Sequence, residues 1–433
     1  PSQRRGGIVS APLKVALVAL NSSGYQSLAL GYLRVGAQAE VRLKDRVGFT
    51  TLDLTVDLDP WWVAYRVLGL EPDVLGVSVT CWNARSVFEL CRVVHAARPE
   101  TLIVLGGPEV GPIAEEVLEA HPEVDVVVRG EGEVTFTELL AAHLRGRDLA
   151  RVDGLSTRRS DGRVASAPDR ALVADLDSIP SPYLTGVMAP VDGGAYIESY
   201  RGCPHRCAYC FEGKGYGRIR SFSEARVRAE IDAIAAAPGV RTFSFIDPVF
   251  NLTEDRLEWL ADALEPHAAR GVRLHTIEVD IERIDDTQVT ALVRAGVASV
   301  ETGPQSIGKV ALAECRRGFD RERFVVGVRL LREAGISVEC DLIVGLPGDT
   351  VDDFFDGLAF AIGLDPGTVQ SSTLHVLPGT DLWARADELG VSYDPEPPHE
   401  VIATNTIGYQ DLRRAEVRAL WLQRQYRARI EKE

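Results

Sequence analysis

The chain has 433 residues and a net charge of −16 at pH 7, and 45% of its residues are apolar. This length exceeds what one ordinary hydrophobic core serves, so we expect two or three domains. The acidic balance argues against a nucleic-acid partner, because phosphate binding depends on clustered Lys and Arg, and no apolar run is long enough to span a bilayer.

The N-terminal region alternates short apolar runs with helix-length segments. Residues 1–14 carry arginines but no apolar stretch, which predicts a disordered start rather than a signal peptide and a cytoplasmic location. Runs rich in Val, Leu and Ile that alternate with helices indicate a doubly wound parallel sheet, a Rossmann-type α/β fold, which we assign to residues 1–150. The predicted strands are KVALVAL (14–20), AEVRL (39–43), VLGVSVT (74–80), TLIVLGG (101–107) and VDVVVRG (124–130), with helices at 84–99 and 112–122.

Residues 151–193 change character. The segment TRRSDGRVASAPDR (157–170) predicts a polar hairpin, and the Pro- and Gly-punctuated segment that follows predicts a linker. We place the boundary to the next domain between Pro180 and Gly194.

A second alternation of strands and helices fills residues 194–382. Six strands fit a partial parallel (β/α)6 barrel better than a full one of eight units, because too few residues remain after the last strand, and its active face lies at the carboxyl ends of the strands. Residues 383–433 predict a loop and a terminal helix. The predicted barrel strands are AYIESY (195–200), RTFSFID (241–247), VRLHTIEVD (272–280), ASVETG (298–303), ISVECDLIVG (336–345) and VQSSTLHVLPG (369–379).

Three of the seven cysteines, Cys203, Cys207 and Cys210, lie close together after the first barrel strand. Thiolates with this spacing can bind three corners of a four-iron, four-sulfur cluster and leave one iron open. A structural zinc site is the alternative, but it requires a fourth ligand, and His205 is too near its neighbouring cysteines to serve easily.

The Cys-x-x-x-Cys-x-x-Cys spacing, with Tyr209 before the last cysteine, resembles the signature of radical S-adenosylmethionine (SAM) enzymes. The resemblance implies that the open iron of a 4Fe-4S cluster is chelated by SAM and that one electron splits the sulfonium bond, giving methionine and a 5′-deoxyadenosyl radical. It also implies a SAM contact at Tyr209, within the cysteine segment, and further contacts at later strand ends. The latter are Asp247 at the methionine amino group, Glu301 and Gln305 at the ribose, and Gly345 and Pro347 beside the adenine.

The N-terminal segments VLGGPEVGP and DVVVRGEGEVTFTELL resemble the cobalamin-binding-type domain that precedes many radical SAM enzymes. Glycines at Gly106 and Gly107 allow a loop to approach a flat ligand, and Gly130 and Gly132 flank a tight strand-to-helix turn. The Asp-x-His-x-x-Gly loop of some corrinoid proteins is absent, and no histidine precedes His95. The sequence therefore leaves open whether cobalamin binds.

Two reactions fit this architecture. The carboxylates expected at barrel strand ends could hold ammonium groups and supply a general base, which favours radical dehydration of a cationic aminosugar and resembles the dehydratases that deoxygenate aminoglycosides in antibiotic biosynthesis. The alternative is cobalamin-dependent methylation of a natural product. The candidate catalytic carboxylates are Glu198, Asp247, Glu278, Asp280 and Asp341.

Either reaction needs an electron donor of the flavodoxin or ferredoxin type, and a ketone product would need a separate NAD(P)H-dependent reductase. A non-enzymatic iron–sulfur carrier is a further hypothesis, but a carrier would need a fourth cysteine and no barrel.

Overall fold

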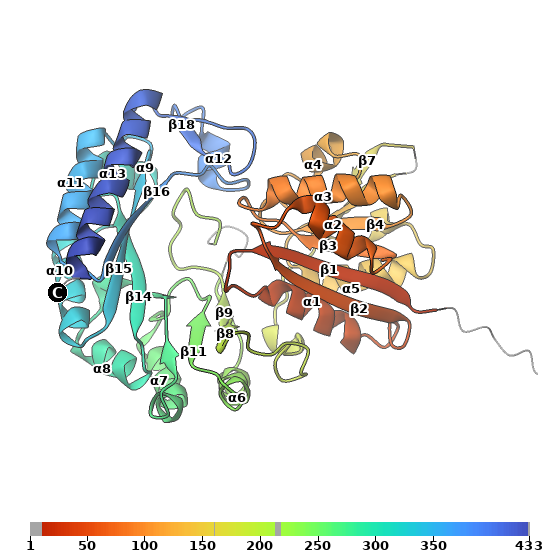
Figure 1. Ribbon diagram of the computed structural model, residues 1–433, viewed down its shortest axis with the longest axis horizontal. Coiled ribbons are helices and arrows are strands. Elements are labelled where there is room, and N and C mark those ends of the chain that lie inside the picture. The colour runs from red at the N-terminus through yellow and green to blue at the C-terminus, as the bar shows by residue number, and fades with distance from the viewer. Residues whose placement is uncertain (1–10, 160, 213–217, 432–433) are drawn as a thin grey trace, which may run out of the picture. The chain divides into compact units, whose positions relative to one another are not determined.

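The computed structural model describes residues 11–159, 161–212 and 218–431 and divides into two compact units (Figure 1). The first unit comprises Pro1–Leu172 and Ile179–Val187, and the second comprises Val173–Ser178 and Met188–Glu433. The disordered start predicted for the first residues lies, up to residue 10, outside the described part of the chain.

The first unit is built on a seven-stranded sheet in the order β2-β1-β3-β4-β5-β6-β7. Strands β1 to β5 are parallel, which confirms the doubly wound α/β sheet. The hairpin predicted from the polar segment is also present, since β6 and β7 pair antiparallel at one edge. The strands are β1 (Leu13–Asn21), β2 (Val47–Thr55), β3 (Val74–Ser78), β4 (Leu102–Gly106), β5 (Val126–Val128), β6 (Leu155–Arg158) and β7 (Val164–Ser166).

Helices cover both faces of this sheet (Figure 1). Alternate residues of β1 point to opposite faces, so Val18 joins one apolar core while Leu17 joins the other. The first core also contains residues of α2, α3 and α4, and the second contains residues of α1 and α5. The helices are α1 (Leu28–Ala39), α2 (Pro60–Leu68), α3 (Ala84–Ala97), α4 (Ala114–Ala120) and α5 (Gly132–His143).

The prediction of the second strand is wrong. Ala39 ends α1 and residues 41–46 form turns, whereas the strand is β2, Val47–Thr55. This strand lies at the sheet edge and is only half buried, so its residues lack the continuous apolar run of an interior strand.

The second unit contains the six barrel strands predicted from the sequence, which confirms the partial (β/α)6 fold. They form two sheets, β12-β11-β8 and β13-β14-β15-β16, because the third strand is divided where Thr276 adopts a left-handed conformation with φ 50°. The strands are β8 (Gly194–Ile197), β11 (Thr242–Phe245), β12 (Arg273–Leu274), β13 (Ile277–Glu278), β14 (Ser299–Gln305), β15 (Ser337–Val344) and β16 (Thr368–Thr373).

The barrel helices begin at side-chain caps that satisfy free backbone N–H groups. Ser223, Thr253 and Asp320 cap three of them, and Thr350 forms a reciprocal capping box with Asp353. The predicted terminal helix is α13, which packs on β16 and α11. The helices are α6 (Glu224–Ala235), α7 (Glu254–Ala268), α8 (Asp286–Arg294), α9 (Lys309–Glu314), α10 (Arg321–Glu333), α11 (Val351–Gly363), α12 (Asp381–Arg385) and α13 (Tyr409–Ile430).

Short elements complete the second unit. Two antiparallel pairs, β9 with β10 and β17 with β18, lie outside the main sheets. In the described residues, no helix combines the length and the hydropathy that crossing a membrane requires. The short strands are β9 (Tyr200–Arg201), β10 (Arg220–Ser221), β17 (Ser392–Tyr393) and β18 (Val401–Ala403).

Candidate active site and cofactor sites

The three clustered cysteines lie on the segment that follows β9, residues 202–212, which we call the cysteine loop. None of them forms a disulfide, and Cys207 is buried while Cys203 and Cys210 are partly exposed. Burial raises the pKa of both Cys203 and Cys210 to about 11, and the negative charge of Cys207 contributes to each shift. The three sulfurs are therefore close enough to interact electrostatically.

These residues fit a 4Fe-4S cluster. The side chain of Arg317 donates a hydrogen bond to Cys207, with 3.6 Å between Nη1 and Sγ, so a positive charge lies beside a thiolate ligand. Across the described ranges, no three Cys, His, Asp or Glu side chains form a group suited to one metal ion. A cubane does not require such a group, because each thiolate binds a different iron.

A cavity of about 230 Å³ lies at the carboxyl ends of β13, β14 and β15. This is the end of a parallel barrel at which active sites form. Its lining includes His205 from the cysteine loop, so the cavity and the three cysteines belong to one site. We call it the barrel cavity. Its polar lining residues are His205, Glu278, Asp280, Glu282, Glu301, Thr302, Gln305, Arg317 and Asp341.

Carboxylates on three neighbouring strands dominate the electrostatics of the barrel cavity. Glu301 pairs in register with Glu278 on one side and with Glu339 on the other. Desolvation by the surrounding protein, together with the charge of Glu301, raises the pKa of Glu278 to about 7 and the pKa of Asp341 to about 9. The Glu278 side chain still reaches the water of the cavity. The cavity therefore favours a ligand that brings positive charge or hydrogen-bond donors.

Arg317 supplies the guanidinium of this acidic cavity. Burial disfavours its charge, but Tyr209 and Cys207 outweigh this effect and raise the pKa of Arg317. Its Nη2 donates to the Gly303 carbonyl oxygen over 2.5 Å, and its Nε has no hydrogen-bond partner among the described residues. A carboxylate could accept from this group. The cavity thus offers acceptors for an ammonium group and a ribose, and a donor for a carboxylate, which are among the polar groups of SAM.

Five predicted site residues line the barrel cavity and the others lie elsewhere. Glu278, Asp280, Glu301, Gln305 and Asp341 all belong to the lining.

Glu198 instead forms a bidentate pair with Arg201, both at 3.0 Å, and Asp247 is buried against Arg256. Gly345 packs near Val401 and Leu412. Pro347 is buried and is absent from the lining, and Tyr209 lies beside Arg317 and Cys207.

Sequence reasoning missed Arg317 and the contact between His205 and Asp280, whose Nε2 and Oδ2 atoms are 3.4 Å apart. Arg317 follows α9 in the segment ECRRG, more than a hundred residues after Cys207, so no local spacing relates it to the cysteines. The signal that the sequence offered for this position was the pair of adjacent arginines, Arg316 and Arg317.

The first unit contains an apolar cavity of about 150 Å³ at the carboxyl ends of β3, β4 and β5. Gly106 and Gly107, predicted to let a loop approach a flat ligand, line it, and so do Gly130 and Gly132, predicted to flank a tight strand-to-helix turn. At Gly107, φ is 121° and an added Cβ would lie 2.3 Å from the Val79 carbonyl oxygen, so a side chain is excluded there.

Aromatic and aliphatic side chains complete this glycine-lined cavity. Leu33 from α1 and Phe136 from α5 face it. Among the residues that the structure describes, no histidine lines it: His95 and His143 lie on helices, and His121 follows α4. The cavity fits the apolar part of a cofactor, and its lining offers no imidazole to a metal.

Comparison with known proteins finds a family pattern in each of the two units. The sequence pattern of the Radical SAM superfamily matches residues 197–361, and that of the B12 binding domain matches residues 35–140. An uncharacterized methyltransferase, PH0819, of Pyrococcus horikoshii is 26% identical over 390 residues, which cover 88% of this chain and 82% of that protein.

Two further relatives share more identity over less of their own length. The cobalamin-dependent radical SAM methyltransferase TokK of Streptomyces tokunonensis is 31% identical over 80% of this chain and 52% of its own. The 2-(S-pantetheinyl)-carbapenam-3-carboxylate methyltransferase of Streptantibioticus cattleyicolor is 30% identical with the same coverage. This chain therefore spans about half the length of these two proteins.

A solved structure shares the fold. The radical SAM methyltransferase TsrM from Kitasatospora setae superposes with a TM-score of 0.69 at 21% identity, covering 89% of this chain and 79% of that one. The cysteine loop at the barrel and the glycine-lined cavity thus lie in the two regions that the family patterns match. The chain therefore carries a radical SAM domain, whose cysteine loop offers three thiolates to a 4Fe-4S cluster, and an N-terminal B12-binding domain.

Proposed function

We propose that the chain is a cobalamin-dependent radical SAM methyltransferase that acts on a small natural-product molecule. The observation that carries this proposal is the glycine-lined cavity of the B12-binding unit, which occurs in the same chain as the cysteine loop and the barrel cavity. Three relatives that align with both regions are named methyltransferases, which supports the same reaction.

In this proposal the barrel cavity holds SAM beside the cluster. Arg317 binds its carboxylate, because the guanidinium is the fixed positive charge near Cys207. Glu278 accepts from the ammonium group, and Gln305 and Asp341 bind the ribose hydroxyls. Holding these groups in one orientation would convert a bimolecular encounter between SAM and the cluster into an oriented one.

The first unit holds cobalamin through shape rather than through a metal ligand. Leu33 and Phe136 offer apolar contacts, and Gly106 and Gly107 let the backbone approach a flat group closely. Bound there, cobalamin would supply the methyl group that the substrate receives. Because the described lining holds no imidazole, apolar side chains and close backbone approach would hold the cofactor there.

Dehydration of a cationic aminosugar, which the sequence favoured, finds no support in the named relatives, which are methyltransferases. The carboxylates behind that expectation have another explanation. Glu278, Asp280 and Asp341 line one cavity together with Glu301 and Gln305, and SAM itself brings an ammonium and a sulfonium group to it. Acidic strand ends therefore do not require a cationic substrate.

A flavodoxin or ferredoxin-type protein is the proposed electron donor, since splitting SAM requires one electron at the cluster. Methyl transfer does not generate a ketone from an alcohol, so the separate NAD(P)H-dependent reductase is unnecessary in this proposal.

The proposal can be tested without knowing the substrate. Reconstituted, reduced and cobalamin-loaded protein is incubated with SAM that carries a trideuterated methyl group, and the extracted cobalamin is analysed by mass spectrometry. A methyltransferase yields cobalamin that carries the labelled methyl group, together with S-adenosylhomocysteine. Unlabelled cobalamin in protein that does cleave SAM contradicts methyl transfer and returns dehydration to consideration.

A further inference from the structure

Asp247, at the end of β11, occupies the centre of a buried polar network. Its carboxylate accepts from the Ser199 backbone N–H over 2.8 Å and from the Ser199 hydroxyl over 2.6 Å. It also forms an ion pair with Arg256 of α7, and its side chain has no exposed surface. Burial raises the pKa of Asp247, but three donors favour its ionised form.

Arg256 spreads this interaction over several segments. Its guanidinium donates to the Phe250 carbonyl oxygen and to the Ser199 hydroxyl. It also lies over two aromatic rings, 5.0 Å from the ring centre of Tyr200 and 5.5 Å from that of Phe250. Its side-chain hydrogen bonds thus reach Ser199, between β8 and β9, and Asp247 and Phe250 in residues 246–253, which connect β11 to α7.

One side of the network holds the chain just before the cysteine loop. The Tyr200 hydroxyl donates to the Val249 carbonyl oxygen over 2.9 Å and accepts from the Val249 N–H over 2.8 Å. Tyr200 is three residues before Cys203 and is 2% exposed. The first cluster ligand is therefore anchored to residues 246–253.

The other side of the network holds the wall of the barrel cavity. The Phe250 N–H donates to the Glu278 carbonyl oxygen over 2.7 Å. The Asn251 side chain donates to the Asp280 carbonyl oxygen over 3.0 Å and accepts from the Asp280 N–H over 2.8 Å. The segment that is fixed by Arg256 thus determines where two lining residues stand.

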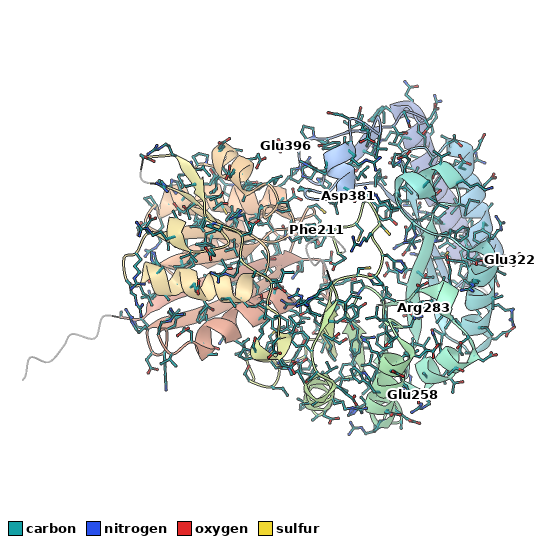
Figure 2. All side chains as sticks on the ribbon, turned by 180° about the vertical axis from the view of Figure 1, so that it is seen from behind. Phe211, Glu258, Arg283, Glu322, Asp381 and Glu396 are labelled. Atoms are coloured by element: carbon teal, nitrogen blue, oxygen red, sulfur yellow. The ribbon has the colours of Figure 1, made fainter. Side chains whose placement is uncertain are left out.

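Two further contacts complete the connection. Arg283, labelled in Figure 2, donates to the Leu252 carbonyl oxygen over 2.8 Å. His205 of the cysteine loop lies 3.4 Å from the Asp280 carboxylate. Residues 246–253 therefore contact both the approach to the cluster and the cavity wall.

We propose that Asp247, Arg256 and Tyr200 are positioning residues for SAM cleavage, because they hold the cysteine loop and the barrel-cavity wall at a fixed separation. None of the three lines the cavity, so they act through Cys203 and through Glu278 and Asp280. The proposal rests on SAM binding beside the cluster, but it does not depend on methyl transfer.

The test uses two conservative variants, Tyr200→Phe and Asp247→Asn, in the reconstituted full chain. Each removes interactions of the network and retains side-chain volume. Glu230→Gln is the matched control, because Glu230 is a buried carboxylate whose 2.7 Å ion pair with Arg226 lies within α6. Iron and sulfide content, thermal stability, the kcat and KM for 5′-deoxyadenosine formation, and the electron paramagnetic resonance spectrum of the reduced cluster with SAM are measured for each.

Both network variants are expected to retain their iron and to lose about 10- to 100-fold in kcat/KM, with an altered spectrum in the presence of SAM, since small displacements of reacting groups have effects of this size. Glu230→Gln is expected to match the wild type in kcat/KM and in the spectrum of the reduced cluster with SAM. Network variants that keep their iron, kcat/KM and spectrum overturn the proposal. Variants that lose activity only in proportion to their loss of iron or thermal stability also overturn the proposal, because any buried substitution can have that effect. A wild-type protein that cleaves no SAM contradicts the proposed function instead.

Discussion

Arg317 connects the cysteine loop to the barrel cavity. Its Nη1 lies 3.6 Å from the Cys207 sulfur, and its Nη2 donates to the carbonyl oxygen of Gly303, which lines the cavity. One guanidinium thus lies beside a cluster ligand and beside the site proposed for SAM. This arrangement suits a cosubstrate whose carboxylate must reach the cluster.

Replacing Arg317 with Lys is expected to raise the KM for SAM by about 10- to 100-fold. Lysine keeps a charge but loses the planar fork, and a charge-assisted hydrogen bond contributes about 1.5–3 kcal/mol. Arg316→Lys is the matched control, because the neighbouring Arg316 is exposed and pairs with Asp381. The readout is the SAM dependence of 5′-deoxyadenosine formation, and equal KM values in both variants contradict the role of Arg317.

Replacing Cys207 with Ser is expected to abolish SAM cleavage, since a site left with two thiolates cannot hold the cubane in place. Iron content per chain and 5′-deoxyadenosine yield measure the effect. Cys91→Ala serves as the control, because Cys91 is a buried thiol of α3 in the other unit. Full turnover by Cys207→Ser, or purified protein that contains zinc and no iron, refutes the cluster assignment.

Replacing Gly106 with Leu is expected to reduce bound cobalamin at least about tenfold, because overfilling a packed site costs about 1–3 kcal/mol. An added Cβ at Gly106 meets Val128 at an ordinary 3.5 Å, so the backbone tolerates the substitution while the rest of the side chain enters the cavity. Gly48→Leu, on the edge strand β2 with open space around its Cβ, is the control. Absorbance after reconstitution gives the cobalamin content, and equal loading of both variants argues against this cavity as the site.

The burial of Asp349 predicts that the free energy of unfolding depends on pH. Asp349 is fully buried beside Ser306, and burial raises its pKa from 3.8 to about 6. Because the folded pKa exceeds the unfolded one, the stability associated with the protonated acid is present below about pH 4 and is lost as the pH rises through 6. The unfolding free energy of Asp349→Asn minus that of the wild type should therefore increase by about 1 kcal/mol from pH 5 to pH 7. Denaturant unfolding at several pH values measures this, and a constant difference contradicts the assigned pKa.

Patterns within one segment allowed much of the fold to be predicted. Parallel strands such as β3 and β15 are rich in Val, Leu and Ile, and the spacing of such runs along the chain revealed both units. The edge strand β2 was misplaced because it is half exposed, and the break at Thr276 could not be foreseen because a left-handed threonine has no sequence signal.

The site could be predicted only in part, because several of its contacts join segments that are far apart in the sequence. The spacing of the cysteines indicated the cluster, since its ligands lie on one loop. Asp247 and Gln305 both stand at strand ends, yet Gln305 lines the cavity whereas Arg256 binds Asp247 in the interior. Only the packing of α7 against the barrel distinguishes the two positions.

The most direct test of methyl transfer measures two SAM-derived products in one reaction. Reduced protein with an intact cluster is assayed for 5′-deoxyadenosine and S-adenosylhomocysteine, with and without bound cobalamin. The account predicts that 5′-deoxyadenosine forms in both cases and that S-adenosylhomocysteine forms only when cobalamin is bound. If cobalamin-loaded protein makes 5′-deoxyadenosine but never S-adenosylhomocysteine, the chain is not a methyltransferase of this kind.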